Sequence, residues 1–459
     1  MAIRRSRGAS GRAFDRARGD AVRRCARAAR QQRCQQLAPP LQRFESVDRV
    51  PPVERHIAII TPPTVGHINP LQVLARELVS IGHRVTMVHV GDMARYVTDP
   101  QVGFASVEAG EAGALDAYLA LLGQPTGARG LTRMIRATAA MTATLLDGAP
   151  ATLARIGADA VIADTAEPAG AAIAERLRLP FVASVTGLPL LREENVPPPF
   201  LGWRYRADPI GRNRNNGGYS VADILMRPIT RVLDERRRAW GLGREAAPLC
   251  WAAQCPRGFD YPRSALPATF AYGGPWRYAE GTAEPLDLPR DSRPLVFCSL
   301  GTLQGSRRAL FQVMAAACAA VGARAVIGHG GGLTPAEEAA LPGDPLVRAF
   351  WPQQAVLRHC AAAVLHGGFN TVLDALAAGV PIVALPIAFE QPGTAARIAY
   401  VGAGRVLSPR GLTRTVLAQA LRGVMAEPSY RAAARRIGDE MAASGGAARA
   451  AVQVSAALS

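Results

Sequence analysis

Apolar and polar positions change in a regular order from residue 56 onward, and each block has the length of a strand or a helix. Residues 56–61 (HIAIIT) form a short apolar run rich in β-branched side chains, which predicts a buried strand. Asn69 and Pro70 then suit an N-cap and a first helical position. The predicted helix has apolar residues at helical spacing along one face: Leu71, Leu74, Leu78 and Ile81. Residues 84–90 (RVTMVHV) predict the next strand, so the order strand–helix–strand predicts a parallel sheet.

The same alternation continues along the chain in two blocks. Further strands are predicted over 160–163, 181–185, 294–299, 325–328, 362–365 and 382–385. Further helices are predicted from Pro168, over 307–320, from Asn370 and throughout 413–459. Residues 193–218 include three consecutive prolines and predict a loop, and a helix over 221–240 interrupted at Pro228 is expected to follow.

These blocks predict an α/β protein with two facing Rossmann-like domains, each built on a parallel sheet, and a cleft between them. The predicted limits are 55–240 for the first domain, 241–290 for a linker, and 291–459 for the second domain with its closing C-terminal helices. Residues 1–54 are rich in arginine and contain no apolar run long enough for a signal peptide, so we expect a disordered extension. Because ligands of open parallel sheets bind beyond the carboxyl ends of the strands, polar residues at these ends are the candidates for a site.

The charge of the chain is strongly basic. Its 459 residues include 53 Lys and Arg against 36 Asp and Glu, a formal net charge of +17, and all of the 53 are arginine. A basic balance indicates nucleic acid or an anionic membrane as a partner, and it also arises from arginine-rich coding. We find no zinc-finger spacing, no aromatic RNA-binding run and no basic heptad helix, which argues against nucleic acid.

Cysteine usage and hydropathy narrow the class of protein further. The seven cysteines form no CxxC pair, which favours a reducing cytoplasm over a disulfide framework or a cysteine metal site. No window of ~18 uninterrupted apolar residues predicts a membrane-spanning helix. With 49% apolar and 19% charged residues, the chain is typical of globular proteins.

The first half carries a candidate acid–base pair. His67 follows the first strand, and an imidazole there suits a general base that removes a proton from a hydroxyl group. Asp164 ends another strand of the same half, and a carboxylate beside a histidine fixes its tautomer and stabilises the imidazolium. A solvated loop histidine and a helix N-cap are the plainer interpretations of these two residues.

The second half carries candidate anion-binding turns. Ser299 and Thr302 follow its first strand, where small hydroxyl residues let backbone N–H groups approach a phosphate, although a plain tight turn has the same composition. The densest pattern is residues 350–391. There His366, Gly367 and Gly368 end one strand, and several polar residues stand on the helix and at the strand end that follow: Asn370, Thr371, Asp374, Glu390 and Gln391.

Residues 350–391 resemble the nucleotide-sugar signature of family 1 glycosyltransferases, the UDP-glycosyltransferases with the GT-B fold. The resemblance covers about residues 55–435 and includes PPTVGHINPLQVLARELVSIGHRVT and GFNTVLDALAAGVPIVALPIAFEQPGTAARI. Three shorter segments, VPPPFLGW, SLGTLQG and PIAFEQPG, resemble the branch of this family that acts on carotenoids.

The resemblance implies a metal-independent, inverting hexosyltransferase without a cofactor, with UDP-glucose as co-substrate. It makes His67 the base and Asp164 its orienting partner. It places the diphosphate against a polar set at the turns: Ser299, Thr302, His366, Gly368, Asn370 and Thr371. It assigns Asp374 to the ribose, Gln353 to uracil, and Glu390 with Gln391 to the donor sugar. The family's stacking tryptophan corresponds to Phe350 with Trp351 next to it, so either ring can stack on uracil, and Asp374 replaces a glutamate.

The implied acceptor is lipophilic: zeaxanthin or a related hydroxycarotenoid, or alternatively a sterol, macrolide or polyketide. Such acceptors reside in membranes, and the segment 203–244 carries aromatic and basic residues around an apolar helix side. Its apolar residues are Ile224, Leu225, Ile229 and Leu233, and its arginines include Arg236–Arg238. We therefore expect a cytoplasmic protein with a peripheral contact on the inner, anionic face of the membrane, although a solvated arginine face over a core helix explains the same pattern.

Three other functions fit parts of the pattern. A nucleotide-sugar epimerase shares the two-domain architecture, but its product is an altered free nucleotide sugar. A silent binding protein needs no pairing of His67 with Asp164. A nicotinamide enzyme is disfavoured because no GxGxxG follows the first strand, and a Walker-type loop requires the lysine that this chain lacks.

Overall fold

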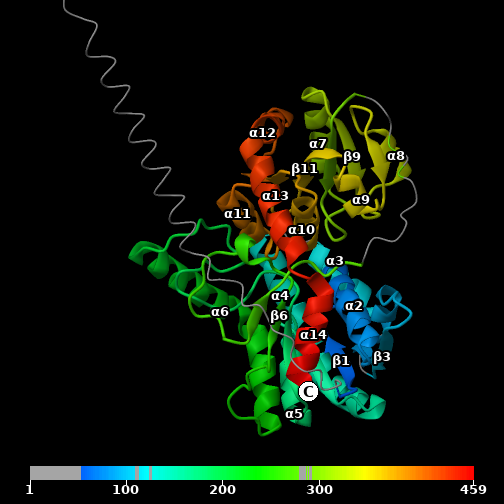
Figure 1. The fold of residues 1–459 in the computed structure, drawn as a ribbon, viewed down its shortest axis with the longest axis vertical. Coiled ribbons are helices and arrows are strands. Elements are labelled where there is room, and N and C mark those ends of the chain that lie inside the picture. The colour runs from blue at the N-terminus through cyan, green and yellow to red at the C-terminus, as the bar shows by residue number, and fades with distance from the viewer. Residues whose placement is uncertain (1–52, 109–112, 124–126, 279–285, 287, 289–291) are drawn as a thin grey trace, which may run out of the picture. The chain divides into compact units, whose positions relative to one another are not determined.

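The computed structural model describes residues 53–108, 113–123, 127–278, 286, 288 and 292–459 (Figure 1). The predicted N-terminal extension, residues 1–54, lies outside these residues except for Val53 and Glu54. All predicted strands and helices lie within the described part of the chain. Most of residues 279–290, the end of the predicted linker, lie outside it.

Seven parallel strands form the first sheet, in the order β3-β2-β1-β4-β5-β6-β7. Their bounds are β1 His56–Ile60, β2 Arg84–Val90, β3 Gly103–Val107, β4 Ala160–Asp164, β5 Phe181–Val185, β6 Trp251–Ala253 and β7 Phe270–Tyr272. Every residue of β1, β4 and β5 is buried, as expected for a parallel sheet that is covered by helices on both faces.

Helices cover this sheet, and the C-terminal helix is one of them. The bounds are α2 Val65–Ser80, η1 Gly91–Tyr96, α3 Ala114–Gly123, α4 Gly127–Ile156, α5 Ala169–Leu177, α6 Pro209–Ala239 and α14 Gly446–Leu458. In Figure 1 the red α14 lies beside the blue α2, although α2 is the first described helix and α14 the last. Ser455 Oγ lies 2.8 Å from His83 Nε2, and Arg55 donates to the carbonyl of Leu458 at 3.0 Å. The last helix of the chain therefore belongs to the core of the first sheet.

Six parallel strands form the second sheet, in the order β10-β9-β8-β11-β12-β13. Their bounds are β8 Leu295–Ser299, β9 Arg324–Gly328, β10 Leu346–Arg348, β11 Cys360–Leu365, β12 Ile382–Ala384 and β13 Gly404–Val406. The helices of this part are α7 Arg308–Ala320, α8 Pro335–Ala339, α9 Gln353–Leu357, α10 Phe369–Ala377, α11 Gln391–Val401, α12 Arg414–Ala426 and α13 Pro428–Ala443, with the short η2 Arg257–Phe259. Two separate apolar clusters cover the sheet. The predicted α/β class with two parallel, Rossmann-like sheets is confirmed.

The predicted starts of α2 and α6 are wrong. Each helix begins earlier in the sequence, and a polar residue, Thr64 or Asp208, is its N-cap. Helix α2 begins at Val65 after Thr64, so Pro70 lies inside the helix and Asn69 is not its N-cap. Helix α6 begins at Pro209 inside the predicted loop, because the side chain of Asp208 accepts a hydrogen bond from the Gly211 N–H at 2.7 Å. Helix α6 also continues through Pro228 instead of being interrupted there.

The segment predicted as a linker contains two strands that the sequence pattern did not indicate. Strands β6 and β7, each of three residues, extend the first sheet beyond β5. Such short strands carry no periodicity that distinguishes them from a loop. None of the described helices combines the length and the apolar character needed to cross a bilayer.

Candidate active site

Four polar side chains meet at the carboxyl ends of β1, β4 and β5. Asp164 is the last residue of β4, and Thr61 and Thr186 directly follow β1 and β5. His67 lies in the first turn of α2. Because these strands are neighbours in the sheet, residues that are far apart in sequence lie within hydrogen-bond distance.

Asp164 is the centre of this group. Its Oδ2 lies 3.0 Å from His67 Nδ1 and accepts hydrogen bonds from the hydroxyls of Thr186 at 2.9 Å and Thr61 at 3.2 Å. Its Oδ1 accepts from the Ala166 N–H at 2.9 Å. The Asp164 side chain is fully buried, whereas 26% of the His67 side chain is exposed. The carboxylate is therefore held in place from four sides, and no described residue bonds to Nε2 of the imidazole.

The electrostatics of the pair favour a basic imidazole. Burial lowers the pKa of His67, but the charge and the hydrogen bond of Asp164 raise it, and the net pKa lies above its ordinary value of 6.5. Burial raises the pKa of the nearby Glu390, and it raises the pKa of Glu167, on the turn after β4, to about 7. The sequence analysis did not identify Glu167, which accepts hydrogen bonds from the Thr142 hydroxyl and the Ala169 N–H, both at 3.2 Å.

On the second sheet, two glycines enclose the imidazole of His366. A Cβ at Gly301 would lie 2.7 Å from His366 Nε2, and a Cβ at Gly368 would lie 2.7 Å from His366 Cε1. The ring is buried, and burial lowers its pKa to about 4, so His366 is neutral at pH 7. Its Nδ1 is buried without a hydrogen-bond partner among the described residues. Small residues at these two positions are thus required for the ring to fit.

The turn after β8 lies against the same histidine. The Ser299 carbonyl accepts a hydrogen bond from the His366 N–H at 3.2 Å, and the Ser299 hydroxyl accepts one from the Gly301 N–H at 3.2 Å. The turn places Thr302 on the surface. The predicted anion-binding residues Ser299 and His366 are therefore neighbours, and part of the role of Ser299 is to shape the turn.

The start of α10 contacts the first sheet directly. Asn370 Nδ2 donates to the carbonyl of Gly66 at 2.6 Å, one residue before His67. Asn370 Oδ1 accepts from Gln254 Nε2 at 2.9 Å, and the same amide nitrogen of Gln254 donates to the carbonyl of Thr186. Asn370, one of the predicted diphosphate-binding residues, is therefore hydrogen-bonded to Gly66 directly and to Thr186 through Gln254.

Arg277 joins this network, although the sequence analysis did not identify it. Its guanidinium donates to the carboxylate of Asp374 at 2.7 Å and to the carbonyl of Asn370 at 3.1 Å. The other carboxylate oxygen of Asp374 accepts from Gln353 Nε2 at 2.5 Å. Asp374 and Gln353, predicted to bind ribose and uracil, are thus brought together, and Arg277 lies between them and Asn370. No sequence signal identified Arg277, because the strand that precedes it, β7, has only three residues and was not predicted.

The two candidate stacking rings differ in their surroundings. Trp351 is half-buried, donates from Nε1 to the carbonyl of Ile327 at 3.0 Å, and has the Arg348 guanidinium 4.2 Å from its ring centre. Phe350 is 67% exposed. One ring is therefore anchored by the protein and the other is open to solvent.

The remaining predicted donor residues lie at the start of α11 and in α10. Gln391 is buried, and its Oε1 accepts from the N–H groups of Ile387 and Ala388, both at 2.9 Å, so its carbonyl holds the preceding turn. Glu390 and Thr371 are half-buried. The electrostatic interaction between Glu390 and His67 places the start of α11 near the candidate base.

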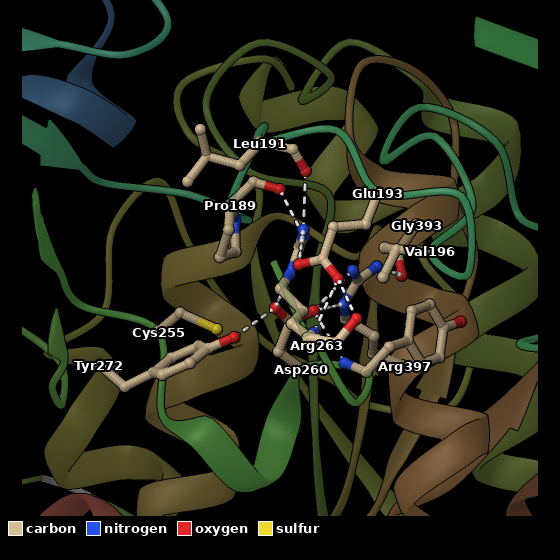
Figure 2. Close-up of polar contacts among 12 residues, drawn as sticks. Pro189, Leu191, Glu193, Val196, Cys255, Asp260, Arg263, Tyr272, Gly393 and Arg397 are labelled. Carbon is tan, nitrogen blue, oxygen red and sulfur yellow. Dashed lines mark hydrogen bonds and ion pairs between the residues drawn. The ribbon is translucent and has the colours of Figure 1, made fainter. Parts of the chain in front are cut away.

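A buried ionic cluster lies beside α11 and is made of Glu193, Asp260, Arg263 and Arg397 (Figure 2). Asp260 accepts from Arg263 Nε at 2.7 Å, from Arg397 Nε at 2.8 Å and from the Tyr272 hydroxyl at 3.0 Å. Arg263 also donates to the carbonyls of Pro189 and Leu191, at 2.9 and 2.7 Å, in the loop after β5. The cluster therefore connects this loop, which precedes the segment 203–244, to the helix that begins with Gln391.

Among the described residues, no group of three or more His, Cys, Asp and Glu side chains is arranged to hold a metal ion. The site consists of the His67–Asp164 pair and one glycine-flanked turn with polar side chains. Such a combination suits the transfer of a group from an anionic leaving group to a hydroxyl.

Comparisons with known proteins agree with this chemistry. Residues 313–456 match the family model "Erythromycin biosynthesis protein CIII-like, C-terminal domain". The chain is 36% identical over 403 residues to a zeaxanthin glucosyltransferase from Pantoea ananas, covering 85% of this chain and 93% of that protein. It is 38% identical over 365 residues to a zeaxanthin glucosyltransferase from Pseudescherichia vulneris, covering 77% and 86%.

Solved structures show the same architecture. The calicheamicin glycosyltransferase CalG4 superposes with a TM-score of 0.69 at 26% identity, covering 88% of this chain and 98% of that one. The glycosyltransferase of kitacinnamycin superposes with a TM-score of 0.73 at 20% identity, covering 89% and 100%. The chain is therefore a glycosyltransferase with the GT-B fold, and it belongs to family 1 of these enzymes.

Proposed function

We propose that this glycosyltransferase moves glucose from UDP-glucose to a hydroxyl group of zeaxanthin or a related hydroxycarotenoid, with inversion at the anomeric carbon. The observation that carries the proposal is the position of His67. Its Nδ1 contacts the buried Asp164, and the carbonyl of the preceding Gly66 contacts Asn370 at the start of α10. A base on the first sheet thus lies next to the glycine-flanked turns of the second.

In the proposed reaction the acceptor hydroxyl gives its proton to His67 Nε2. The hydroxyl oxygen forms a bond to the anomeric carbon while the bond from that carbon to the diphosphate oxygen breaks, and its electron pair leaves with UDP. Asp164 stabilises the imidazolium that results. Attack from the side opposite to the leaving group inverts the anomeric configuration.

The donor is proposed to bind along the turns of the second sheet. The N–H groups at the start of α10 and a neutral His366 donate hydrogen bonds to the diphosphate. The exposed ring of Phe350 stacks on the base, because Trp351 is already anchored and has Arg348 against its ring. In this proposal Glu390 and the side-chain amide of Gln391 contact the sugar hydroxyls.

The acceptor assignment rests on the two zeaxanthin glucosyltransferases that share 36% and 38% identity with this chain. Other relatives are named for different acceptors and sugars. One is a demethyllactenocin mycarosyltransferase from Streptomyces fradiae, 29% identical over 429 residues. A macrolide, sterol or polyketide is therefore the alternative acceptor class.

A lipophilic acceptor requires access to the membrane, and α6 is the proposed contact. Val221, Ile224 and Leu225 are exposed on α6, and neither Arg227 nor Arg231 has a side-chain partner among the described residues. Exposed apolar residues flanked by cations suit the interface of an anionic bilayer. Leu233, in contrast, packs against the first core and does not belong to this surface.

Arginines 236–238, expected in the same contact, are engaged within the protein. Arg237 is buried and donates to both carboxylate oxygens of Glu175, at 2.7 and 2.9 Å, and Arg236 pairs with Asp147. The test is therefore vesicle flotation of the variant Arg227→Glu/Arg231→Glu with phosphatidylglycerol vesicles. We expect binding of the wild type and loss in this variant, with Arg410→Glu/Arg414→Glu as a control of equal charge change. Equal flotation of wild type and variant contradicts the contact.

Product analysis tests the proposed reaction. Purified protein is incubated with UDP-glucose or TDP-glucose and with zeaxanthin, a sterol or a macrolide aglycone, and the products are identified by mass spectrometry. A hexosyl adduct of zeaxanthin formed preferentially from UDP-glucose is expected. A glycoside of only a sterol or macrolide establishes the alternative acceptor, and an altered free nucleotide sugar without a glycoside establishes an epimerase.

A further inference from the structure

Arg277 takes part in the hydrogen-bond network at the start of α10, where the diphosphate is proposed to bind. Its guanidinium contacts the Asn370 carbonyl at 3.1 Å, the Asn370 side-chain oxygen at 3.3 Å and the Asp374 carboxylate at 2.7 Å. The backbone carbonyl of Trp276 and the side chain of Gln254 hold the opposite edge, at 2.9 and 3.4 Å. The side chain is 19% exposed, so it is held in place but still accessible.

The proposed donor site needs a positive charge that its other residues do not supply. A nucleoside diphosphate carries at least two negative charges, and its charge increases when it leaves the sugar. His366 is neutral at pH 7, since burial lowers its pKa to about 4. Ser299, Thr302 and Asn370 carry no charge. Arg277 carries a positive charge, and its planar donors match phosphate oxygens.

The carboxylate of Asp374 is shared between Arg277 and Gln353. Asp374 contacts the guanidinium through Oδ1, while its Oδ2 accepts from Gln353. Asp374 is also one methylene shorter than the glutamate expected at this position. All five N–H donors of the guanidinium have a partner, but its bonds to the side-chain oxygens of Asn370 and Gln254, at 3.3 and 3.4 Å, are long. These two weak bonds can be exchanged for bonds to an anion while the bond to Asp374 keeps the guanidinium in position.

We propose that Arg277 binds the diphosphate of the nucleotide-sugar donor and stabilises the departing UDP, while its bonds to Asp374 and Asn370 set its position. This inference rests on the proposed function, because it assumes that a nucleoside diphosphate occupies the start of α10. It makes the segment after β7 a part of the donor site, although this segment follows the first sheet. Nucleotide binding therefore draws residues of both sheets together.

Calorimetric titration with UDP and with uridine tests the assignment. Arg277→Gln is expected to weaken UDP binding by about 10- to 100-fold, the usual loss for a hydrogen bond to a charged group, and to leave uridine binding unchanged. Arg277→Lys retains the charge and is expected to recover part of the UDP affinity. The matched control is Arg405→Gln, which removes a partly exposed arginine paired with Glu427 on the second sheet.

Each result has one interpretation. Equal weakening of UDP and uridine in Arg277→Gln means that Arg277 only shapes the ribose site through Asp374, and the assignment is overturned. Unchanged UDP affinity overturns it as well. A wild-type protein that binds neither UDP nor TDP overturns the proposed function itself, and this result is visible before any variant is made.

Discussion

Asn370 donates a hydrogen bond to the backbone carbonyl of Gly66, which is available to it because a proline lies four residues further along the helix. Gly66 lies in the first turn of α2, where its carbonyl would normally accept from the N–H four residues later. That residue is Pro70, which has no N–H. The free carbonyl instead accepts from Asn370 at 2.6 Å, 304 positions away in the sequence. A proline inside a helix thus provides the acceptor that links the two sheets next to His67.

Substitution of Pro70 by alanine is expected to raise the thermal stability of the protein and to lower its activity. Alanine supplies the missing N–H, so the Gly66 carbonyl bonds within α2 and its contact with Asn370 weakens. Thermal unfolding should shift upward, because an internal proline costs a helix up to ~3 kcal/mol, while kcat falls several-fold. Pro150→Ala, inside α4 and away from the site, should stabilise without changing kcat. Equal kcat values for both variants contradict the role of the contact.

The pH dependence of the reaction follows from the His67–Asp164 pair. Neutral imidazole accepts the proton, and Asp164 holds the pKa of His67 above 6.5, so kcat/KM should rise through a midpoint above pH 6.5. Asp164→Asn removes the charge that raises this pKa. The midpoint should therefore move to lower pH, and the plateau should fall by about 10²-fold or more.

The measurement is a pH–rate profile at low substrate, with Asp116→Asn as the control. Asp116 is an exposed carboxylate on α3 that pairs with Arg95, so the profile of this variant should match the wild type. A midpoint that stays in place or moves upward in Asp164→Asn is incompatible with His67 as the base.

The packing of His366 between two glycines makes a further prediction. Gly368 has an ordinary backbone conformation, so Gly368→Ala adds only a methyl group, which would lie 2.7 Å from His366 Cε1. The imidazole of His366 must therefore move, and its proposed hydrogen bond to the diphosphate is lost. UDP affinity is expected to fall by about tenfold or more. Gly243→Ala, where no atom lies within 4 Å of the new Cβ, should bind UDP normally. Calorimetry compares the two, and equal affinities mean that His366 does not contact the donor.

The candidate site residues at strand ends could be predicted because the strands themselves could be recognised in the sequence. Asp164, Ser299 and His366 each follow or end an apolar run whose length and β-branched content identify it as a strand. Once the strands are recognised, the carboxyl edge of a parallel sheet brings their ends together. His67 and Asp164 were paired in this way, and the structure confirms their contact at 3.0 Å. Their catalytic roles stay predictions.

Contacts between distant side chains left no comparable signal. Arg277 follows a strand of three residues, too short to recognise, and its partners on α10, Asn370 and Asp374, are 93 and 97 positions away. The start of α2 was misplaced because Asn69 and Pro70 have the composition of a helix start, although the helix already begins at Val65. The position of Arg277 depends on tertiary contacts that local sequence does not encode, whereas the start of α2 was missed because Thr64 stands at its N-cap in place of Asn69.

The ionic cluster beside α11 gives a prediction about stability. Arg397 is 1% exposed, and Arg397→Met removes one of the two guanidiniums that neutralise the buried Asp260. A buried pair that loses one partner is expected to cost about 3–5 kcal/mol in the free energy of unfolding, measured by urea denaturation. Arg405→Met, which breaks a surface pair, should cost ~1 kcal/mol or less. Similar small losses in both variants show that the cluster contributes little.

The rate of glycoside formation by His67→Ala tests the central claim most directly. Initial rates with UDP-glucose and zeaxanthin are compared for wild type, His67→Ala and His359→Ala, which changes an exposed histidine just before β11. Loss of a general base should reduce kcat by about 10²- to 10⁴-fold in His67→Ala, with UDP affinity unchanged and His359→Ala equal to the wild type. A His67→Ala protein that forms the glycoside at the wild-type rate would contradict the account.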